Sequence, residues 1–181
     1  MTTKPTLYTA RALDDPLTLP YDTALSVLTD GDIHMEHGFM RWGSNHTLLV
    51  EVAQADTAFL AIYKPRSGER PLWDFPDGTL CQRETAAYML SEWLGWHIVP
   101  PTVLRDGPRG IGSLQVFINH DPQQHYFTFD ESASDAARVS TQVQRMAAFD
   151  AIANNADRKG GHCLLDEVEH LWGIDHGLTF H

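Results

Sequence analysis

The segment NNADRKGGHCLL, near the C-terminal end of the chain, has residue types and spacing that suit phosphoryl transfer. Its carboxylate, Asp157, could accept a proton from a hydroxyl group, and Lys159 could neutralise charge on a transferred phosphoryl group. Two glycines then allow a ligand to approach the backbone closely, just before His162. Asp175, in the later motif WGIDHG, offers the hard oxygen ligand that Mg²⁺ prefers. Each of these residues alone is also explained by a solvated turn that caps the C-terminal end of a helix, whereas their combination predicts a site that handles a metal-bound phosphate.

The strand-end lysine Lys64, in the motif AIYKP, is a second candidate for contact with phosphate. It is one of three lysines in the chain and ends an apolar run. Such lysines commonly extend along an apolar surface to reach water, and that structural explanation stays open. A phosphate-binding lysine needs a carboxylate to position it, which Glu84 in the following helical pattern could provide. An acid near a helix start is also favoured by the helix dipole, so Glu84 has a structural explanation as well.

The turn that contains Ser44 and Asn45, in GSNHTLLVEV, is a third candidate. Tight turns of small residues can present backbone N–H groups to a phosphate, although most of them only join strands. The sequence has no GxxxxGK[ST] motif and no GxGxxG after a strand. These absences exclude a P-loop nucleotide site and a Rossmann fingerprint.

The C-terminal segment also allows an alternative interpretation as a transition-metal site. Imidazole and carboxylate ligands together suit Zn²⁺ or Fe²⁺. The residues that could form this cluster are His162, Cys163, Asp166, His170, Asp175 and His176. Their spacing matches neither an HExxH motif nor a facial triad.

The charge balance of the chain limits its partners. With 24 acidic residues against 13 Lys and Arg, the formal net charge is −11, which repels nucleic-acid backbones and anionic lipid surfaces. We therefore expect no nucleic-acid and no membrane partner. Cys81 and Cys163 lack zinc-binding spacing and are expected to be reduced. The N-terminal residues lack the apolar core of a secretory signal, and no apolar run could span a bilayer, so we expect a soluble, cytoplasmic protein.

Hydrophobic periodicity predicts the elements that precede the candidate residues. Residues 1–20, rich in Thr, Pro and Asp, predict a loosely held arm, and residues 22–28 predict a short helix. The runs 47–52 and 58–64, joined by the turn AQAD, predict paired strands. Their nearly continuous apolar residues indicate a sheet that is covered on both faces. The Pro- and Gly-rich segment 65–79 predicts an ordered loop or a linker.

Helical and strand patterns alternate in the rest of the chain. Residues 82–95 predict an amphipathic helix, 96–118 predict three strands, 135–155 predict a long helix, and 163–174 predict a hairpin. The predicted apolar stripes are Ala86, Ala87, Met89, Leu90, Trp93 and Leu94 in the first helix, and Val139, Val143, Met146, Ala147 and Ile152 in the second. This order indicates an α+β protein with a sheet-based first lobe and a mainly helical second lobe.

Taken in order, the motifs resemble the atypical branch of the kinase fold. The chain looks like the bacterial phosphoinositide-3/4-kinase-like proteins and, more distantly, HipA-type kinases. The motifs that carry this resemblance are GSNHTLLVEV, AIYKP, RETAAYMLSEWLG, GSLQVFI, NNADRKGGHCLL and WGIDHG, and it spans residues 38–181. It implies a bilobal kinase-like fold with an N-terminal arm at 1–22, a β-rich N-lobe at 23–118 and a short, mainly helical C-lobe at 119–181.

The resemblance implies a nucleotide-binding role for residues of the expected N-lobe. Ser44 and Asn45 would belong to the nucleotide loop. Lys64 would contact the α- and β-phosphates of ATP, with Glu84 as its ion-pair partner. The hinge would contact the adenine edge through backbone groups of Gln115, Val116 and Phe117.

The resemblance assigns the chemistry to the expected C-lobe. Asp157 would be the catalytic-loop aspartate, Lys159 would lie over the γ-phosphate, and Asp175 would bind Mg²⁺, with Mn²⁺ as the alternative cation. The loop of lipid kinases reads D-R-H-x-x-N, whereas here Lys159 replaces the His and His162 replaces the metal-binding Asn. His162 would then face the nucleotide and the second metal position, although imidazole is a poor ligand for Mg²⁺.

The expected function is therefore an ATP- and Mg²⁺-dependent phosphotransferase whose acceptor is a protein, a small metabolite or the chain itself. Two alternatives stay open: a nucleotide-binding pseudokinase with a regulatory role, and a nucleotidyl transferase. Related kinases continue well beyond the Asp-x-Gly motif, so two alternatives are open: the protein is a minimal form, or a partner or a second copy of the chain completes the short C-lobe.

Overall fold

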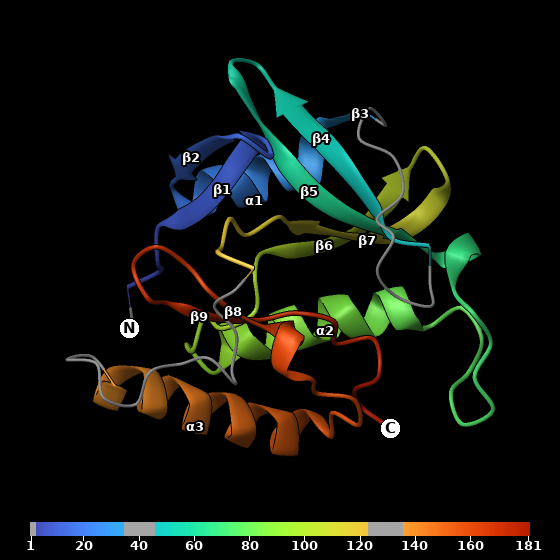
Figure 1. The fold of residues 1–181 in the computed structure, drawn as a ribbon. Helices are drawn as coiled ribbons and strands as arrows, with labels where there is room; N and C mark the ends of the chain where they lie inside the picture. The colour runs from blue at the N-terminus through green and yellow to red at the C-terminus, as the bar shows by residue number, and fades with distance from the viewer. Residues whose placement is uncertain (1–2, 35–45, 123–135) are drawn as a thin grey trace.

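An antiparallel sheet of five strands, in the order β3-β4-β5-β7-β6, organises the fold (Figure 1). The computed structural model describes residues 3–34, 46–122 and 136–181. The five strands are β3 (Asp32–His34), β4 (Leu48–Gln54), β5 (Thr57–Pro65), β6 (Thr102–Gly107) and β7 (Gly110–Val116). Together with the helices described below, the sheet makes this an α+β protein, as predicted.

Both faces of the central strands are buried, which explains their nearly continuous apolar sequences. Leu48 of β4 lies opposite Tyr63 of β5, and on this face the main core contains Leu48, Val50, Val52, Phe59, Ala61 and Tyr63. On the other face Leu49 lies opposite Ile62, and Leu49 packs with Leu60 in a smaller cluster. The same alternation puts Lys64 on the face of Ile62. The predicted strand pair and its two-sided burial are confirmed.

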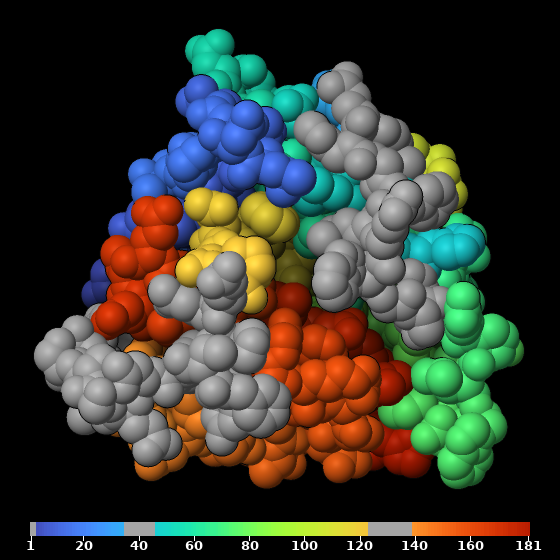
Figure 2. Space-filling view, viewed as in Figure 1, coloured from blue at the N-terminus to red at the C-terminus, as the bar shows by residue number. Residues whose placement is uncertain are grey.

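The N-terminal residues form a packed hairpin, so the prediction of a loosely held arm is wrong. Strands β1 (Leu7–Ala12) and β2 (Asp15–Leu19) pair antiparallel, and Leu7 and Leu19 are buried in the main core. Ala10 packs on the second face of the sheet with Leu49 and Leu60. Most of the polar residues that suggested an arm lie on the exposed side and in the turn, while the apolar residues Leu7, Ala10 and Leu19 are buried. Figure 2 shows this hairpin in blue above the C-terminal residues in orange and red.

The described part of the chain contains three α-helices: α1 (Tyr21–Asp30), α2 (Leu80–Trp93) and α3 (Ala136–Ala153). In Figure 1, α2 lies between the sheet and α3, and it contacts both. A short 3₁₀ turn, η1 (Arg66–Gly68), follows β5, and another, η3 (Gly160–His162), leads into the hairpin of β8 (Cys163–Leu165) and β9 (Leu171–Gly173). None of the described helices is long and apolar enough to cross a membrane.

The helices were predicted correctly, but their buried faces only in part. Two members of the α2 stripe, Met89 and Trp93, are 64% and 91% exposed. Ala87 of the stripe is buried as predicted, and the other buried residues of α2 are Leu80, Cys81, Glu84, Tyr88 and Ser91. Polar side chains belong to the buried face because they have internal partners: the Ser91 hydroxyl, for example, accepts hydrogen bonds from the N–H groups of Ile98 and Val99.

In α3 the prediction was also right about the helix and partly wrong about its face. Met146 is buried as expected, but Ala147 and Ile152 are exposed, and Phe149 and Ala153 are buried instead. Of the three strands expected in residues 96–118, two exist as β6 and β7. The first is an irregular segment in which the Ile98 carbonyl accepts a hydrogen bond from Gly173.

Candidate functional site

Lys64, near the end of β5, lies between two carboxylates that come from distant parts of the chain. Its ammonium donates a hydrogen bond to Oε1 of Glu84 in α2 and another to Oδ1 of Asp175, at 2.8 Å. Glu84 is buried, Lys64 is largely buried, and Asp175 is about half exposed. The structure therefore brings together three of the residues that the sequence singled out.

The position of Glu84 follows from how α2 begins. The carboxylate of Glu69, in the loop after β5, accepts hydrogen bonds from the N–H groups of Leu80 and Cys81, at 3.0 and 2.9 Å. This carboxylate binds the otherwise unpaired donors of the first helical turn and suits the helix dipole. Glu84 then reaches from the second turn to Lys64 with one oxygen, while its other oxygen accepts the N–H of His176 at 2.9 Å.

The pKa values keep the Lys64–Asp175 pair charged at neutral pH. Burial alone would lower the pKa of Lys64, but the attraction of Glu84 and Asp175 outweighs it and raises the pKa overall. The Lys64 charge holds the pKa of Asp175 well below its usual range, although burial opposes this effect. Asp175 also adopts a left-handed backbone conformation, with φ 60°.

Asp157 and Lys159 lie on the loop between α3 and η3, and both are accessible to solvent. Their side chains pair at 2.8 Å, and this hydrogen bond raises the pKa of Lys159. The Asp157 N–H donates to Oδ1 of Asn155 at 3.0 Å, which fixes the loop directly before the candidate catalytic carboxylate. The N–H of Ile174, directly before Asp175, donates to the carbonyl of His162 at 2.9 Å, so the two loops are neighbours.

His162 approaches the same place from η3. Its Nε2 lies 3.4 Å from Oδ2 of Asp175, and its side chain is largely buried. Burial is the main cause that lowers the pKa of His162 below its ordinary value. A neutral imidazole thus lies beside the carboxylate proposed for the metal.

The remaining predicted nucleotide-binding residues divide into two groups. Ser44 and Asn45 lie outside the described residues. In the expected hinge, the N–H groups of Val116 and Phe117 donate to the carbonyls of Pro101 and Leu60, each at 3.0 Å. The side-chain amide of Gln115 donates to Thr102 Oγ1 at 2.8 Å. Since these donors are already bonded within the fold, a base would have to contact other groups of this segment.

The alternative transition-metal site has no geometric support in the part of the chain that the structure describes. No group of three or more His, Cys, Asp or Glu side chains there could hold a metal ion. Asp166, one of the proposed ligands, instead accepts hydrogen bonds from the N–H groups of Val168 and His170 and from the indole of Trp172. Its role is to hold the β8–β9 hairpin.

Two functional candidates, Asp150 and Arg158, were missed from the sequence. The Arg158 side chain is largely buried and pairs with Asp150 of α3 through two hydrogen bonds of 2.8 Å. Arg158 directly follows Asp157, and that adjacency was the available signal. Its partner Asp150 is eight positions earlier, and the apolar periodicity of α3 did not predict which way that residue faces.

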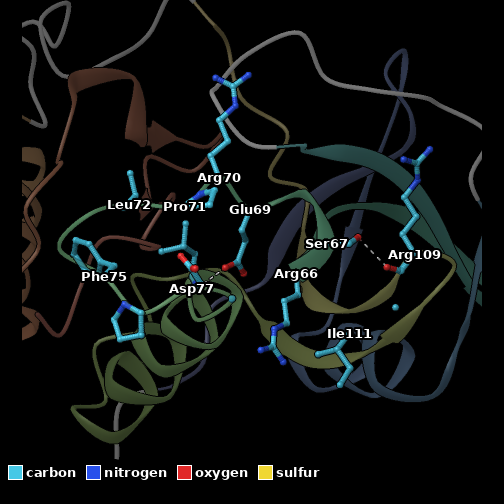
Figure 3. A pocket seen from close by; sticks show the side chains of 14 residues that line it. Arg66, Ser67, Glu69, Arg70, Pro71, Leu72, Phe75, Asp77, Arg109 and Ile111 are labelled. Atoms are coloured by element: carbon cyan, nitrogen blue, oxygen red, sulfur yellow. Dashed lines mark hydrogen bonds between the residues drawn. The ribbon is translucent and has the colours of Figure 1, made fainter.

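A hollow of about 540 Å³ lies next to this site, beyond the end of β5 (Figure 3). Its lining includes Arg66, Arg70 and Arg109, together with the apolar side chains of Phe75 and Ile111. In Figure 3, Arg70 and Arg109 extend in one direction and Arg66 in the other. Lys64 and the two candidate aspartates are not among the residues that line this hollow.

Comparison with known proteins relates the chain to a mycobacterial protein. No protein-family model matches the chain. The chain is 39% identical over 189 residues to a Mycobacterium tuberculosis protein named Protein Rv2133c, and the match covers 88% of this chain and 68% of that relative. Similarity of this extent indicates common descent. The chain belongs to the same family as Protein Rv2133c of Mycobacterium tuberculosis.

Proposed function

We propose that the chain is an ATP- and Mg²⁺-dependent phosphotransferase with a bilobal, atypical kinase-like fold. The sheet with α2 would form the N-lobe, and α3 with the β8–β9 hairpin would form the short C-lobe. The observation that carries this proposal is the contact of the Lys64 ammonium with both Glu84 and Asp175. A lysine positioned by a helix carboxylate, next to a second, accessible carboxylate, suits the binding of a metal-bound polyphosphate.

The residues present fit this pair of cofactors. Asp175 is ionised and about half exposed, and a carboxylate oxygen is a preferred ligand of Mg²⁺. Lys64 would bind phosphate oxygens. Ile62, which is partly buried and lies on the same face of β5 as Lys64, would contact a base. Bound ATP and Mg²⁺ would supply a charge-neutralised phosphoryl group for transfer.

The loop residues would then act on the acceptor. The Asp157 carboxylate could orient an acceptor hydroxyl and accept its proton. Lys159, which now pairs with Asp157, could neutralise charge on the transferred group. The acceptor could be a protein, a small metabolite or the chain itself, and we propose no lipid acceptor because the surface carries a net charge of −11.

Calorimetric titration with ATP and Mg²⁺ tests the binding half of this proposal. We expect Lys64→Met and Asp175→Asn to weaken binding about tenfold or more, because each removes a charge-assisted contact. Lys4→Met is the matched control, since Lys4 pairs with Asp22 elsewhere on the surface. Wild-type protein that binds no ATP in the presence of Mg²⁺ or Mn²⁺ would end the proposal.

Labelled ATP and mass spectrometry test the transfer half. Addition of one phosphoryl group to the chain, to a protein or to a metabolite, lost in Asp157→Asn, is the expected result. ATP binding without any transfer would identify a nucleotide-binding regulatory module instead. Addition of AMP would identify a nucleotidyl transferase that uses the same residues.

A further inference from the structure

We infer that Arg158 is the positioning residue of this site: its guanidinium attaches the loop of Asp157 and the segment of Asp175 to one carboxylate of α3, that of Asp150. The functional roles of Asp157 and Asp175 rest on the function proposed above. The attachment itself rests only on the contacts of the described residues. Sequence motifs pointed to the two aspartates and not to the residue that connects them.

Every N–H donor of Arg158 has an acceptor. Nε and Nη2 donate to the two carboxylate oxygens of Asp150, each at 2.8 Å. Nη1 donates to the carbonyls of His162 and Ile174, at 3.3 and 2.9 Å, and the second N–H of Nη2 points to Nε2 of His176 at 2.7 Å. A guanidinium has five N–H groups, so its full donor capacity is used within this site.

Two of these contacts lie on either side of Asp175. Arg158 binds the carbonyl of Ile174, the residue before it, and the ring of His176, the residue after it. Asp175 adopts φ 60°, a conformation that non-glycine residues keep only when their surroundings hold them there. The N–H of His176 is also bound, to Glu84. Arg158 therefore helps to hold the backbone that points the Asp175 carboxylate toward Lys64.

The loop of Asp157 is attached to the same carboxylate by a second route. The Asn155 amide donates to Oδ1 of Asp150 at 2.8 Å, and its oxygen accepts the Asp157 N–H at 3.0 Å. Asp150 thus accepts three hydrogen bonds, two from Arg158 and one from Asn155. Through these two side chains, a single residue of α3 fixes the backbone at both candidate aspartates.

The ring of His176 supports this assignment. It is completely buried, and it packs edge-on against Phe149 of α3 with ring centroids 5.6 Å apart. Because its Nε2 faces an N–H donor of Arg158, the neutral ring carries its proton on Nδ1, which has no partner among the described residues. A buried imidazole with one unsatisfied nitrogen gives little stability by itself, so its contact with Arg158 is the interaction that accounts for its placement.

A purely stabilising role would not require this geometry. A buried Arg–Asp pair can often be replaced by apolar residues without loss of stability. The donors of Arg158, however, are directed at the main chain and ring of the two segments that carry the candidate carboxylates. An error of about 1 Å in such groups can reduce a rate about a hundredfold, which is why positioning residues matter.

Hydrogen exchange of the full chain tests the inference without assuming any activity. In Arg158→Lys, which keeps the charge but loses the five-donor fork, we expect amide exchange to rise about tenfold or more in both 155–162 and 173–177. Exchange in β4 and β5 should stay unchanged. Arg145→Lys, at an exposed position of α3, is the control and should change neither segment. Unchanged exchange in either segment of folded Arg158→Lys would overturn the inference.

The rate measurement connects this role to function. If the wild type transfers phosphate, Arg158→Lys should lower kcat about tenfold to a hundredfold, and the displaced Asp175 should raise the KM for ATP by less than the loss of binding expected of Asp175→Asn. A rise in KM with kcat unchanged would contradict a positioning role. If the wild type transfers nothing, the proposed function fails, while the exchange experiment still decides the inference. Should Arg158→Lys not fold, Asp150→Asn decides it, because it removes the charged acceptor of Arg158: exchange should rise in both 155–162 and 173–177, and no rise in either segment overturns the inference.

Discussion

At the residue scale, Lys64 shares one positive charge between two carboxylates that differ in exposure. Glu84 is buried on the inner face of α2, whereas Asp175 is about half exposed at the start of the C-terminal segment. A buried carboxylate depends on its partner, because an unpaired charge in the interior is strongly unfavourable. A half-exposed carboxylate can exchange its partner for water or a cation. Glu84 is thus suited to hold Lys64, and Asp175 is suited to release it.

Glu84→Gln tests the first of these roles. The substitution keeps an oxygen for the N–H of His176 but removes the charge that faces Lys64. We expect the free energy of unfolding to fall by about 3 kcal/mol, toward the lower end for broken buried pairs because Asp175 still neutralises Lys64. Urea denaturation measures this, with Glu167→Gln at an exposed position as the control. A loss no larger than that of the control would show that Glu84 does not need its charge.

The pH dependence of stability tests the state of Asp175. Lys64 lowers the pKa of Asp175 in the folded chain, so the ionised carboxylate stabilises folding above its ordinary pKa of about 4. This contribution is lost as the pH falls through the lower, folded-state value. In thermal melts, the Tm of the wild type should exceed that of Asp175→Asn most at neutral pH, and this difference in Tm should shrink below about pH 4. Asn tolerates the same left-handed backbone, so the comparison isolates the charge. A difference in Tm that is constant with pH would contradict it.

At the scale of elements, periodicity predicted the three helices and the strands β4, β5, β6 and β7, but it missed the N-terminal hairpin and misassigned part of the buried helix faces. The nearly continuous apolar runs of β4 and β5 were sufficient to predict burial on both faces, because successive side chains of a strand point to opposite faces of the sheet. In α2 the apolar count favoured the side of Met89 and Trp93, which is exposed. The true inner face includes Glu84 and Ser91, whose burial depends on partners far away in sequence. Local pattern cannot supply those partners.

The candidate site was predictable to a similar extent. Lys64, Glu84 and Asp175 were found because each stands in a short motif, and the structure brings them together. The Asp150–Arg158 pair stands in no motif that defines its contact. It arises from the turn after α3, which returns the chain against the helix it has just left. Such contacts become visible only once the path of the chain is known.

The loop residue Glu69 allows a test of how the start of α2 is capped. Its carboxylate binds the N–H groups of Leu80 and Cys81 at the start of the helix. Removing such a cap typically costs about 1 kcal/mol, so Glu69→Ala should lower the free energy of unfolding by about 1–2 kcal/mol. Glu69→Gln, which keeps one acceptor oxygen, should lose less. Urea denaturation of both variants gives the order, and the reverse order would contradict the capping role.

At the scale of the whole molecule, one continuous core joins the elements of both proposed lobes. The main buried cluster includes Leu7 of the N-terminal hairpin, Val50 and Ala61 of the sheet, and Phe149 and Trp172 of the C-terminal part. Substitutions in any of these elements should therefore affect the same cooperative unit. The N-terminal hairpin contributes to this unit although its composition resembles that of a loose arm.

Two leucines of the N-terminal hairpin give the decisive comparison for that conclusion. Leu7 is completely buried, whereas Leu13, in the turn of the same hairpin, is 69% exposed. Truncating a fully buried leucine removes its burial and leaves a cavity, so Leu7→Ala should lower the free energy of unfolding by about 2–5 kcal/mol. Leu13→Ala should change it by no more than about 0.5 kcal/mol, as exposed substitutions do. Both variants change the same atoms in the same element, so differences in the unfolded chain largely cancel. If both substitutions change the free energy of unfolding by a small and equal amount in urea denaturation, the hairpin is a loosely held arm. If only Leu7→Ala lowers it strongly, the hairpin is part of the core.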